Sequence, residues 1–442
     1  MDSVRYYDIR HVRGSATHVD IDNGVVESAG TSFFDQAVVR VLGPQGWGIL
    51  TLENFDPDAP CDRLIARALE LAAITGDEVD LSDAPQRGVL PVPKAGEDPV
   101  EVSLEEKTEL LSSIEGAARL PGIVNTRARY AESIEEVRFV DSSGCEYSYE
   151  IPRCGFSVVA VASRNGEMQM GRESNYTILG LNLRHRQEMG EKAAQTALAL
   201  LDAKAAKGGR MRAVLDPELA GVFAHEAIGH ASEGDLIQEG NSVLAGKTGE
   251  SIGSPLLTIV DDPSLPYFGF EPVDAEGVAV GRTELIRGGR VNAYMHSRQT
   301  LAAVGNGLAG HARAEPGEAP LVRMSNTFIE EGDASYDEII AECRNGVLLQ
   351  GSRGGQVDPG RGVFQFNAEY GYIIENGEIG TMVRDVSLSG DILGTLHAIT
   401  LLGNDREMHE GYCGKGGQSV PVSDGSPHVL LEDAVVGGNG TD

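Results

Sequence analysis

The chain is organised around the stretch Gly221-Val-Phe-Ala-His225-Glu226-Ala-Ile-Gly-His230-Ala-Ser-Glu233-Gly-Asp235, which places two imidazoles and a carboxylate within six residues. The residues before it predict a helix start, because Asp216 can cap free N–H groups and Pro217 suits the first helical position. We therefore expect His225, Glu226 and His230 to lie on or beside a packed helix. The apolar stripe that would bury this helix consists of Leu219, Val222 and Phe223.

The two histidines are spaced one residue wider than in the common zinc-protease pattern H-E-x-x-H, where both lie on one helix face. The second histidine is at i+5, so the two side chains would lie roughly 140° apart on a regular α-helix. Both rings can reach one metal only if the helix is locally widened or broken, as by a single-turn π-bulge. We expect the distortion at Gly229, because glycine tolerates unusual φ/ψ. The motif is therefore H-E-x-x-x-H.

The motif alone does not distinguish a metal site from two ordinary histidines on a partly buried helix, and the surrounding segments favour the metal site. The stretch from His225 to Asp235, with Gly240-Asn-Ser-Val-Leu-Ala-Gly246 after it, resembles the signature of the TldD/PmbA family. The resemblance is good over the last half of the chain and fainter over the first. It departs at Gly310-His-Ala-Arg-Ala314, so His311 receives no role. Further matching motifs are Thr258-Ile-Val-Asp-Asp262, Asp274-Ala-Glu-Gly277, His296-Ser-Arg-Gln-Thr300, Arg323-Met-Ser-Asn-Thr327, Gly354-Gly-Gln-Val-Asp358, Glu375-Asn-Gly377, Cys413-Gly-Lys-Gly-Gly-Gln-Ser-Val-Pro421 and Val435-Val-Gly-Gly438.

This resemblance implies a metal, a ligand set and an activity. TldD members of the family are zinc metalloproteases, whereas their PmbA (TldE) relatives lack the metal motif. It implies that His225, His230 and Cys413 hold one Zn2+, with Cys413 assigned because Cys413-Gly-Lys-Gly-Gly-Gln matches the family's cysteine motif. Glu226 would then be the general base on zinc-bound water, which attacks a peptide carbonyl.

For Cys413, Glu233 and Asp235 the residues alone allow both a functional and a purely structural interpretation. Residue chemistry alone supports Cys413 less strongly, because a thiolate suits zinc but a free cysteine is often a buried core thiol. The other four cysteines, Cys61, Cys145, Cys154 and Cys343, are interpreted as core thiols. Glu233 and Asp235 can orient a ligand imidazole, although we favour solvated carboxylates on an acidic surface.

The chain's 442 residues predict two or three domains. We predict an α+β protein with an N-terminal mixed α/β-meander domain over residues 1–207. An antiparallel strand-rich C-terminal domain over residues 208–442 carries the metal-site helix and the cysteine motif. Hairpins are expected at Asn23-Gly24 and Asn376-Gly377, and a long helix from 184 to 207 ended by Lys207-Gly-Gly-Arg210. Further helices are expected over 58–75 and 335–344.

The formal net charge of −31 restricts the partners. Such a chain repels nucleic acid phosphates and acidic membrane surfaces, so no direct nucleic acid or membrane contact is expected. The charge favours a halophilic cytoplasm, with an acidic mesophilic protein as the alternative. An odd number of cysteines without a C-x-x-C pair predicts a reduced cytoplasm. No signal peptide is visible, and the apolar runs are too short to span a bilayer.

Our first hypothesis is a zinc metalloprotease that cuts unstructured peptides or small unfolded proteins. The resemblance also implies a dimer, either with a PmbA/TldE-type paralogue or with itself. The alternative is a non-catalytic regulatory protein of the gyrase-modulator type, acting through protein–protein contact. A third possibility is the family's inactive subunit. The set His225, Glu226 and His230 argues against both, because a pure binder has no need of a general base beside two ligands.

Overall fold

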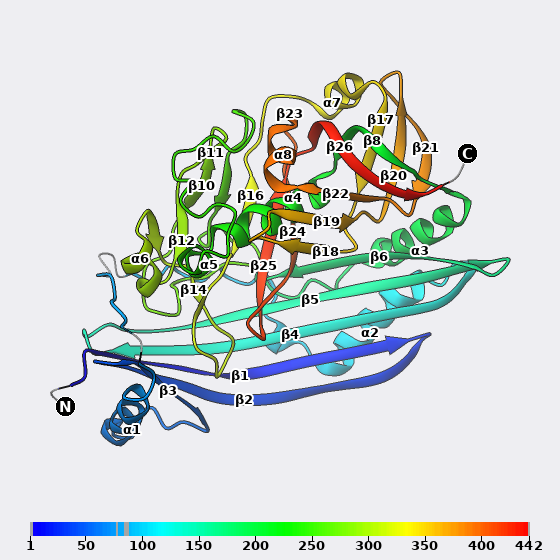
Figure 1. Cartoon of the computed structure of the whole chain (residues 1–442). Coiled ribbons are helices and arrows are strands. Elements are labelled where there is room, and N and C mark those ends of the chain that lie inside the picture. Colours follow the sequence, from blue (N-terminus) through cyan, green and yellow to red (C-terminus); the bar gives the residue numbers. More distant parts are fainter. Residues whose placement is uncertain (1–2, 77, 84–87, 441–442) are drawn as a thin grey trace.

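A computed structural model describes residues 3–76, 78–83 and 88–440 (Figure 1). The first half of the chain forms a long antiparallel sheet in the strand order β3-β2-β1-β4-β5-β6. The turn at Asn23-Gly24 has φ of 48° and 77°, as the predicted hairpin requires. The strands are β1 (Tyr6–Asp22), β2 (Val25–Gly43), β3 (Gly46–Glu53), β4 (Ile123–Asp141), β5 (Glu146–Arg164) and β6 (Glu167–Thr177).

Helices cover one face of this sheet. Leu111 and Ile114 of α2 (Leu104–Ala117) and Ala193 of α3 (Gln187–Asp202) pack on Tyr130 and Phe156. The helix α1 (Asp62–Ala72) packs at the other end, against β2 and β3. The opposite face meets the second half of the chain, where Tyr176 lies 5.3 Å from Phe268 and 5.9 Å from Tyr412 between ring centroids. A short 3₁₀ turn spans Pro99–Glu101.

Two of the predicted helices are shorter in the structure. The helix expected over 58–75 is α1, and the one expected over 184–207 is α3. The segment 207–210 does not end a helix. It begins a strand, because Gly209 pairs with Val436 and Lys207 with Asn439, partners too distant in the chain for local pattern to reveal.

The second half is built mainly of strands. Its larger sheet has the order β18-β19-β22-β26-β8-β17-β20-β21-β7, with β23 on β26, and a second sheet has the order β11-β10-β9-β16-β25-β24. Both contain parallel pairs within a mainly antiparallel arrangement. The strands are β7 (Lys204–Ala205), β8 (Lys207–Leu215), β9 (Ile259–Asp261), β10 (Thr283–Arg287), β11 (Arg290–Val291), β12 (Tyr294–His296), β13 (Gly307–Ala309), β14 (Ala312–Arg313), β15 (Leu321–Val322), β16 (Asn326–Ile329), β17 (Gly346–Gln350), β18 (Gly355–Asp358), β19 (Val363–Asn367), β20 (Tyr370–Glu375), β21 (Glu378–Arg384), β22 (Ser387–Asp391), β23 (Ile399–Leu402), β24 (Glu407–Lys415), β25 (Gln418–Ser426) and β26 (Val429–Asn439).

The helix α4 (Pro217–Ala224) lies in the middle of this half, with β24 and β25 running from it toward the first sheet (Figure 1). Phe223 packs against Phe364 and Phe366, and a Cβ on Gly221 would lie 2.9 Å from the backbone nitrogen of Gly425. The motif helix is therefore held in a strand-built core. The other helices are α5 (Gly234–Glu239), α6 (Arg298–Val304), α7 (Tyr336–Cys343) and α8 (Ile392–His397).

The architecture confirms the predicted α+β class, with a meander in the first half and a strand-rich second half around the motif helix. The helix predicted over 335–344 is α7, and the Asn376-Gly377 turn joins β20 to β21. The domain boundary near residue 207 stays a prediction. In the described part of the chain no helix is long and apolar enough to cross a membrane.

Candidate metal centre

The motif helix begins as its sequence predicts. The side chain of Asp216 accepts a hydrogen bond from the backbone N–H of Leu219 at 2.9 Å, and Pro217 occupies the first turn. Asp216 also accepts from the backbone N–H of Gly351 at 2.8 Å, which ties the helix start to the loop after β17. The helix therefore runs from a fixed point toward the histidines.

The helix widens where the wider spacing predicts it. A π-helical turn spans His225–Gly229 and a 3₁₀ turn spans His230–Ser232, which confirms the predicted bulge. The two imidazole centroids lie 5.3 Å apart. The reason given for Gly229 is wrong, since its φ of −55° and ψ of −61° are ordinary helical values. A Cβ added at position 229 would lie 1.8 Å from Sδ of Met324. Glycine is therefore required because there is no room for a side chain.

The structure brings Cys413 to the two histidines. Cys413 lies on β24, and its Sγ is 3.5 Å from Nε2 of His230. One donor atom from each of His225, His230 and Cys413 lies within 4.8 Å of the other two, and no other such group of three occurs among the described residues. All three side chains are largely buried, at the place where the widened helix meets the β24–β25 hairpin.

Electrostatics prepare these donors to bind a metal. Burial disfavours the Cys413 thiolate, but the neighbouring His225 and His230 outweigh it and lower the pKa of Cys413 to about 4. Burial also works against the His225 cation, yet Cys413 raises the pKa of His225 to about 8. A thiolate and two imidazoles are a donor set that zinc prefers, and three protein ligands leave a position open in a catalytic site. The residues present therefore fit the metal that the sequence implies.

Glu233 corrects our favoured interpretation of the two acidic residues after the motif. It is fully buried, its carboxylate lies 3.1 Å from Nδ1 of His230, and it accepts from Nζ of Lys415 at 2.9 Å. Burial raises the pKa of Glu233, but His230 and Lys415 outweigh it, so the net shift is downward. Asp235 is partly buried and accepts from Lys415 at 2.7 Å. Neither is a freely solvated carboxylate, and Glu233 orients the ring of His230.

Two residues that hold the candidate metal centre in place were not predicted from the sequence. Lys415 also donates to the carbonyl of Val322 at 3.0 Å, so it links the cysteine strand to both carboxylates. The fully buried Arg323 donates to the carbonyl of Cys413 itself. Both residues belong to motifs that resemble the family's, and Lys415 lies two positions after the cysteine. Their place in these motifs is the signal that could have identified them.

Glu226 differs from its neighbours in exposure. Its side chain is 32% exposed, and its carboxylate lies 3.9 Å from Nε2 of His230. A carboxylate that is beside the donor atoms and open to solvent can exchange protons with a bound molecule. A partly exposed carboxylate therefore lies beside the candidate metal donors.

The remaining histidines and cysteines stay outside the centre. His296 and His311 are buried in a separate polar cluster, where His296 lies 3.1 Å from Thr300 Oγ1 and His311 lies 3.8 Å from Asp261. The five cysteines are free thiols. Of the four predicted core thiols, Cys154 and Cys343 are buried. Cys61 and Cys145 are only partly buried, so the core interpretation is wrong for these two.

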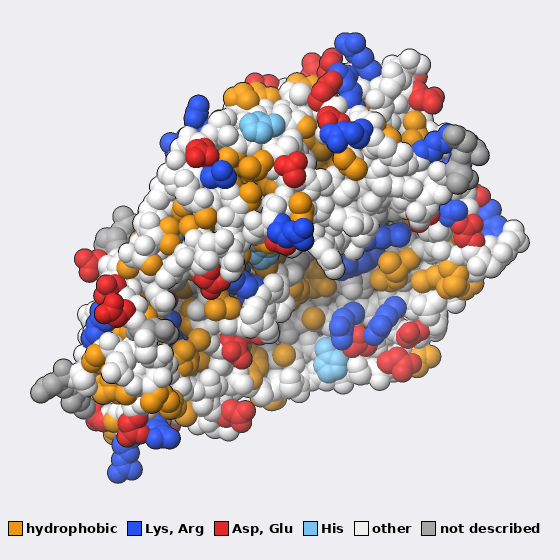
Figure 2. Space-filling model, viewed as in Figure 1, with side chains coloured by type: hydrophobic (Ala, Val, Ile, Leu, Met, Phe, Trp, Pro, Cys, Tyr) orange, Lys and Arg blue, Asp and Glu red, His pale blue; other side chains and the backbone are white. Residues whose placement is uncertain are grey.

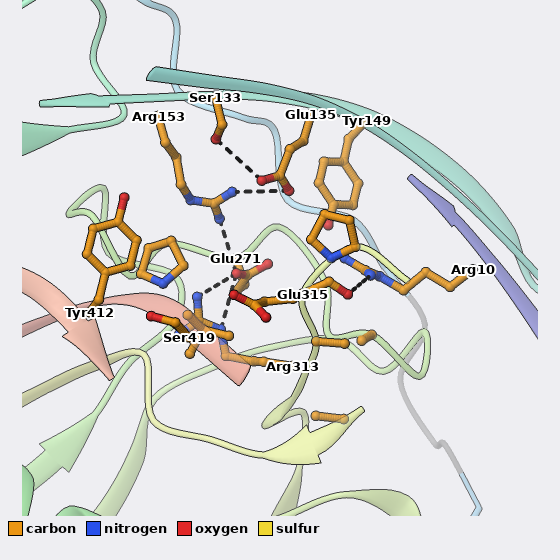
Figure 3. A pocket seen from close by; sticks show the side chains of 16 residues that line it. Arg10, Ser133, Glu135, Tyr149, Arg153, Glu271, Arg313, Glu315, Tyr412 and Ser419 are labelled. Atoms are coloured by element: carbon orange, nitrogen blue, oxygen red, sulfur yellow. Dashed lines mark hydrogen bonds and ion pairs between the residues drawn. The ribbon is translucent and has the colours of Figure 1, made fainter. Parts of the chain in front are cut away.

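A cavity of about 220 Å³ lies between the first sheet and the β24–β25 hairpin (Figure 3). Arg153 from β5 and Arg313 from β14 both donate to Glu271 within it, at 3.1 and 2.7 Å. Tyr412 lines it, and because side chains alternate along a strand, the cavity lies across β24 from Cys413. Figure 2 shows the surface hollowed between the two halves, with Lys and Arg side chains along the hollow.

Comparisons with known proteins find relatives along nearly the whole chain. Three family models match, described as the PmbA/TldA metallopeptidase domain 1 over residues 7–72, central domain over 97–201 and C-terminal domain over 208–438. A protein of Methanothermobacter thermautotrophicus named metalloprotease is 39% identical over 99% of this chain and 96% of its own. A zinc metalloprotease TldD homolog of Saccharolobus solfataricus is 37% identical over 52% of each chain.

Solved structures show the same fold at lower identity. A putative modulator of a DNA gyrase from Thermotoga maritima superposes with a TM-score of 0.82 at 21% identity, covering 98% of this chain and 96% of that one. TldE from Thermococcus kodakarensis gives a TM-score of 0.79 at 20% identity, covering 98% and 97%. These two likenesses concern the fold alone.

Proposed function

The chain belongs to the PmbA/TldD metallopeptidase family, and we propose that it is a zinc-dependent protease that hydrolyses peptide bonds of unstructured peptides or small unfolded proteins. The observation that supports this best is the convergence of His225, His230 and Cys413 within 4.8 Å, with the partly exposed carboxylate of Glu226 beside them. A buried thiolate next to two imidazoles has no evident structural task, whereas it is a strong set of metal donors.

His225, His230 and Cys413 would hold the zinc. A relative named zinc metalloprotease supports this choice of metal. Bound there, zinc supplies a Lewis acid that polarises a peptide carbonyl and acidifies a coordinated water molecule. The two neighbouring imidazoles lower the pKa of Cys413 to about 4, which favours its thiolate at neutral pH, and Glu233 would fix the ring of His230 from behind.

Glu226 would do the proton transfers. Its carboxylate stands at the accessible side of the donor set, 3.9 Å from Nε2 of His230. It takes the proton from the attacking water and then delivers it to the leaving amine. It follows His225 directly in the chain, so it points away from the direction of that first ligand and can act as a base.

The alternative function is a regulatory protein that binds a partner without cutting it. The description of the Thermotoga maritima structure, a putative modulator of a DNA gyrase, favours this alternative. A binding protein has no need of an ionisable carboxylate beside three metal donors, so we place it second. The TldE structure supports a TldE-type paralogue as a possible dimer partner.

The test is Glu226→Gln, measured for zinc content, peptide affinity and peptide turnover on one preparation. Glutamine has nearly the same shape but cannot take the proton, so turnover should fall about 10²- to 10⁴-fold while zinc and peptide binding survive. Glu239→Gln, at the exposed end of α5, is the matched control and should keep wild-type turnover.

Turnover of the Glu226→Gln variant within a factor of about two of wild type would remove Glu226 as the base, since general-base loss costs far more. A wild-type protein that bound zinc and peptide yet never cut the peptide, even beside its paralogue, would favour the regulatory alternative.

A further inference from the structure

Arg323 has the largest side chain among the fully buried residues that the structure describes. It lies between β15 and β16. One terminal nitrogen of its guanidinium donates to the carbonyl of Cys413, and the other donates to the carbonyl of Gln418 at 3.4 Å. Among the described residues Arg323 forms no ion pair: no carboxylate oxygen lies within 4.0 Å of its guanidinium nitrogens. Its two terminal nitrogens therefore bond only backbone oxygens of the cysteine hairpin, while its Nε has no hydrogen-bond partner among the described residues.

Such an arrangement is costly to bury, because a guanidinium removed from water normally requires a carboxylate partner. What it provides is geometry. Cys413 stands on β24 and Gln418 on β25, either side of the turn at Gly416 and Gly417, which have φ of 60° and 84°. A planar, rigid fork can bond both carbonyls at once and fix the spacing of the two strands.

The neighbours of Arg323 in the chain make contacts of the same kind. The carbonyl of Val322 accepts from Lys415 at 3.0 Å, again on the hairpin. Met324 packs so closely on the π-helical turn that a Cβ at Gly229 would lie 1.8 Å from its sulfur. The segment 322–324 therefore touches the cysteine strand with two residues and the histidine turn with the third.

We propose that Arg323 is a positioning residue of the metal centre, which sets the distance between the Cys413 thiolate and the two histidines. It acts through the Cys413 backbone and touches neither substrate nor metal. The proposal rests on the proposed zinc site. It adds that the three donors, His225, His230 and Cys413, form a tight site only when the segment 322–324 links them. His230 and Cys413 are 183 positions apart in the chain.

The experiment uses Arg323→Lys and Arg323→Met in the full chain. Zinc affinity is measured by competition with a chelator, and the thiolate-to-cobalt charge-transfer absorption is recorded after loading with Co2+. Loss of such support typically lowers metal affinity about 10- to 100-fold. Arg323→Met should show the full loss and a weakened cobalt band. Arg323→Lys should fall between, because a single ammonium cannot span both carbonyls.

Arg313→Lys is the matched control. Arg313 is also buried and donates to the carbonyl of Met324 at 2.7 Å, but it does not reach the hairpin. It should keep wild-type zinc affinity and cobalt absorption. An equal loss in Arg313→Lys, or wild-type affinity and spectrum in both Arg323 variants, would overturn the proposal. If Arg323→Met does not fold, Arg323→Lys decides alone. A wild-type chain that bound no zinc would overturn the proposed function itself.

Discussion

The ionisation of Cys413 depends on its two histidine neighbours, and this can be measured without metal. The folded pKa of about 4 lies below the ordinary value of 9.0, so the metal-free protein should keep its thiolate as the pH falls from neutrality toward about 4. The pKa of His225 is raised to about 8, so zinc must displace a proton below that pH and its affinity should fall as the pH decreases.

The thiolate is followed by its ultraviolet absorbance, with Cys413→Ser as the reference that lacks the signal. An absorbance lost at the ordinary pKa of a thiol, or a zinc affinity that does not change between acid and alkaline conditions, would contradict this assignment of charges.

The π-helical turn is the element on which the site depends, and it makes Gly229→Ala informative. The new methyl group would collide with Met324, and overpacking a buried site costs about 1–3 kcal/mol of stability. We expect a lower melting temperature and weaker zinc binding. The double variant Gly229→Ala with Met324→Ala should recover part of both, because the collision is then removed.

Gly116→Ala is the matched control for that pair. Gly116 lies in α2 with open space where its Cβ would stand, so this variant should be as stable as wild type or slightly more stable. A Gly229→Ala protein that melted and bound zinc like wild type would show that Met324 moves freely.

These elements also show how far the sequence could be interpreted. Local chemistry predicted the Asn23-Gly24 turn, the Asp216 cap and the widened helix, because each depends on residues a few positions apart. The burial of Glu233 was not predictable, since its partner Lys415 is 182 positions away. The segment 207–210 was predicted to end a helix, and its place in a strand was missed for the same reason. Gly209 and Lys207 pair with β26, which local patterns do not reveal.

For the whole molecule, the net charge of −31 predicts a strong dependence on salt. At low ionic strength the repulsion between carboxylates acts over about 30 Å, and molar salt shortens this range to about 3 Å. We expect the melting temperature and the peptidase activity to be higher in molar KCl than in dilute buffer. NaCl at equal ionic strength should act alike, because screening depends on ionic strength. A flat or falling melting curve over this range would rule out the halophilic interpretation.

The position of β26 determines when the protein can become active during its synthesis. Val429 of β26 pairs with Leu215, the residue before the Asp216 cap, so part of the support of the motif helix is synthesised long after the helix itself. His230 emerges 183 positions before Cys413, so the three donor atoms cannot meet until the β24 segment has been made. The proposed metal site can therefore assemble only after both the Cys413 strand and β26 have been synthesised.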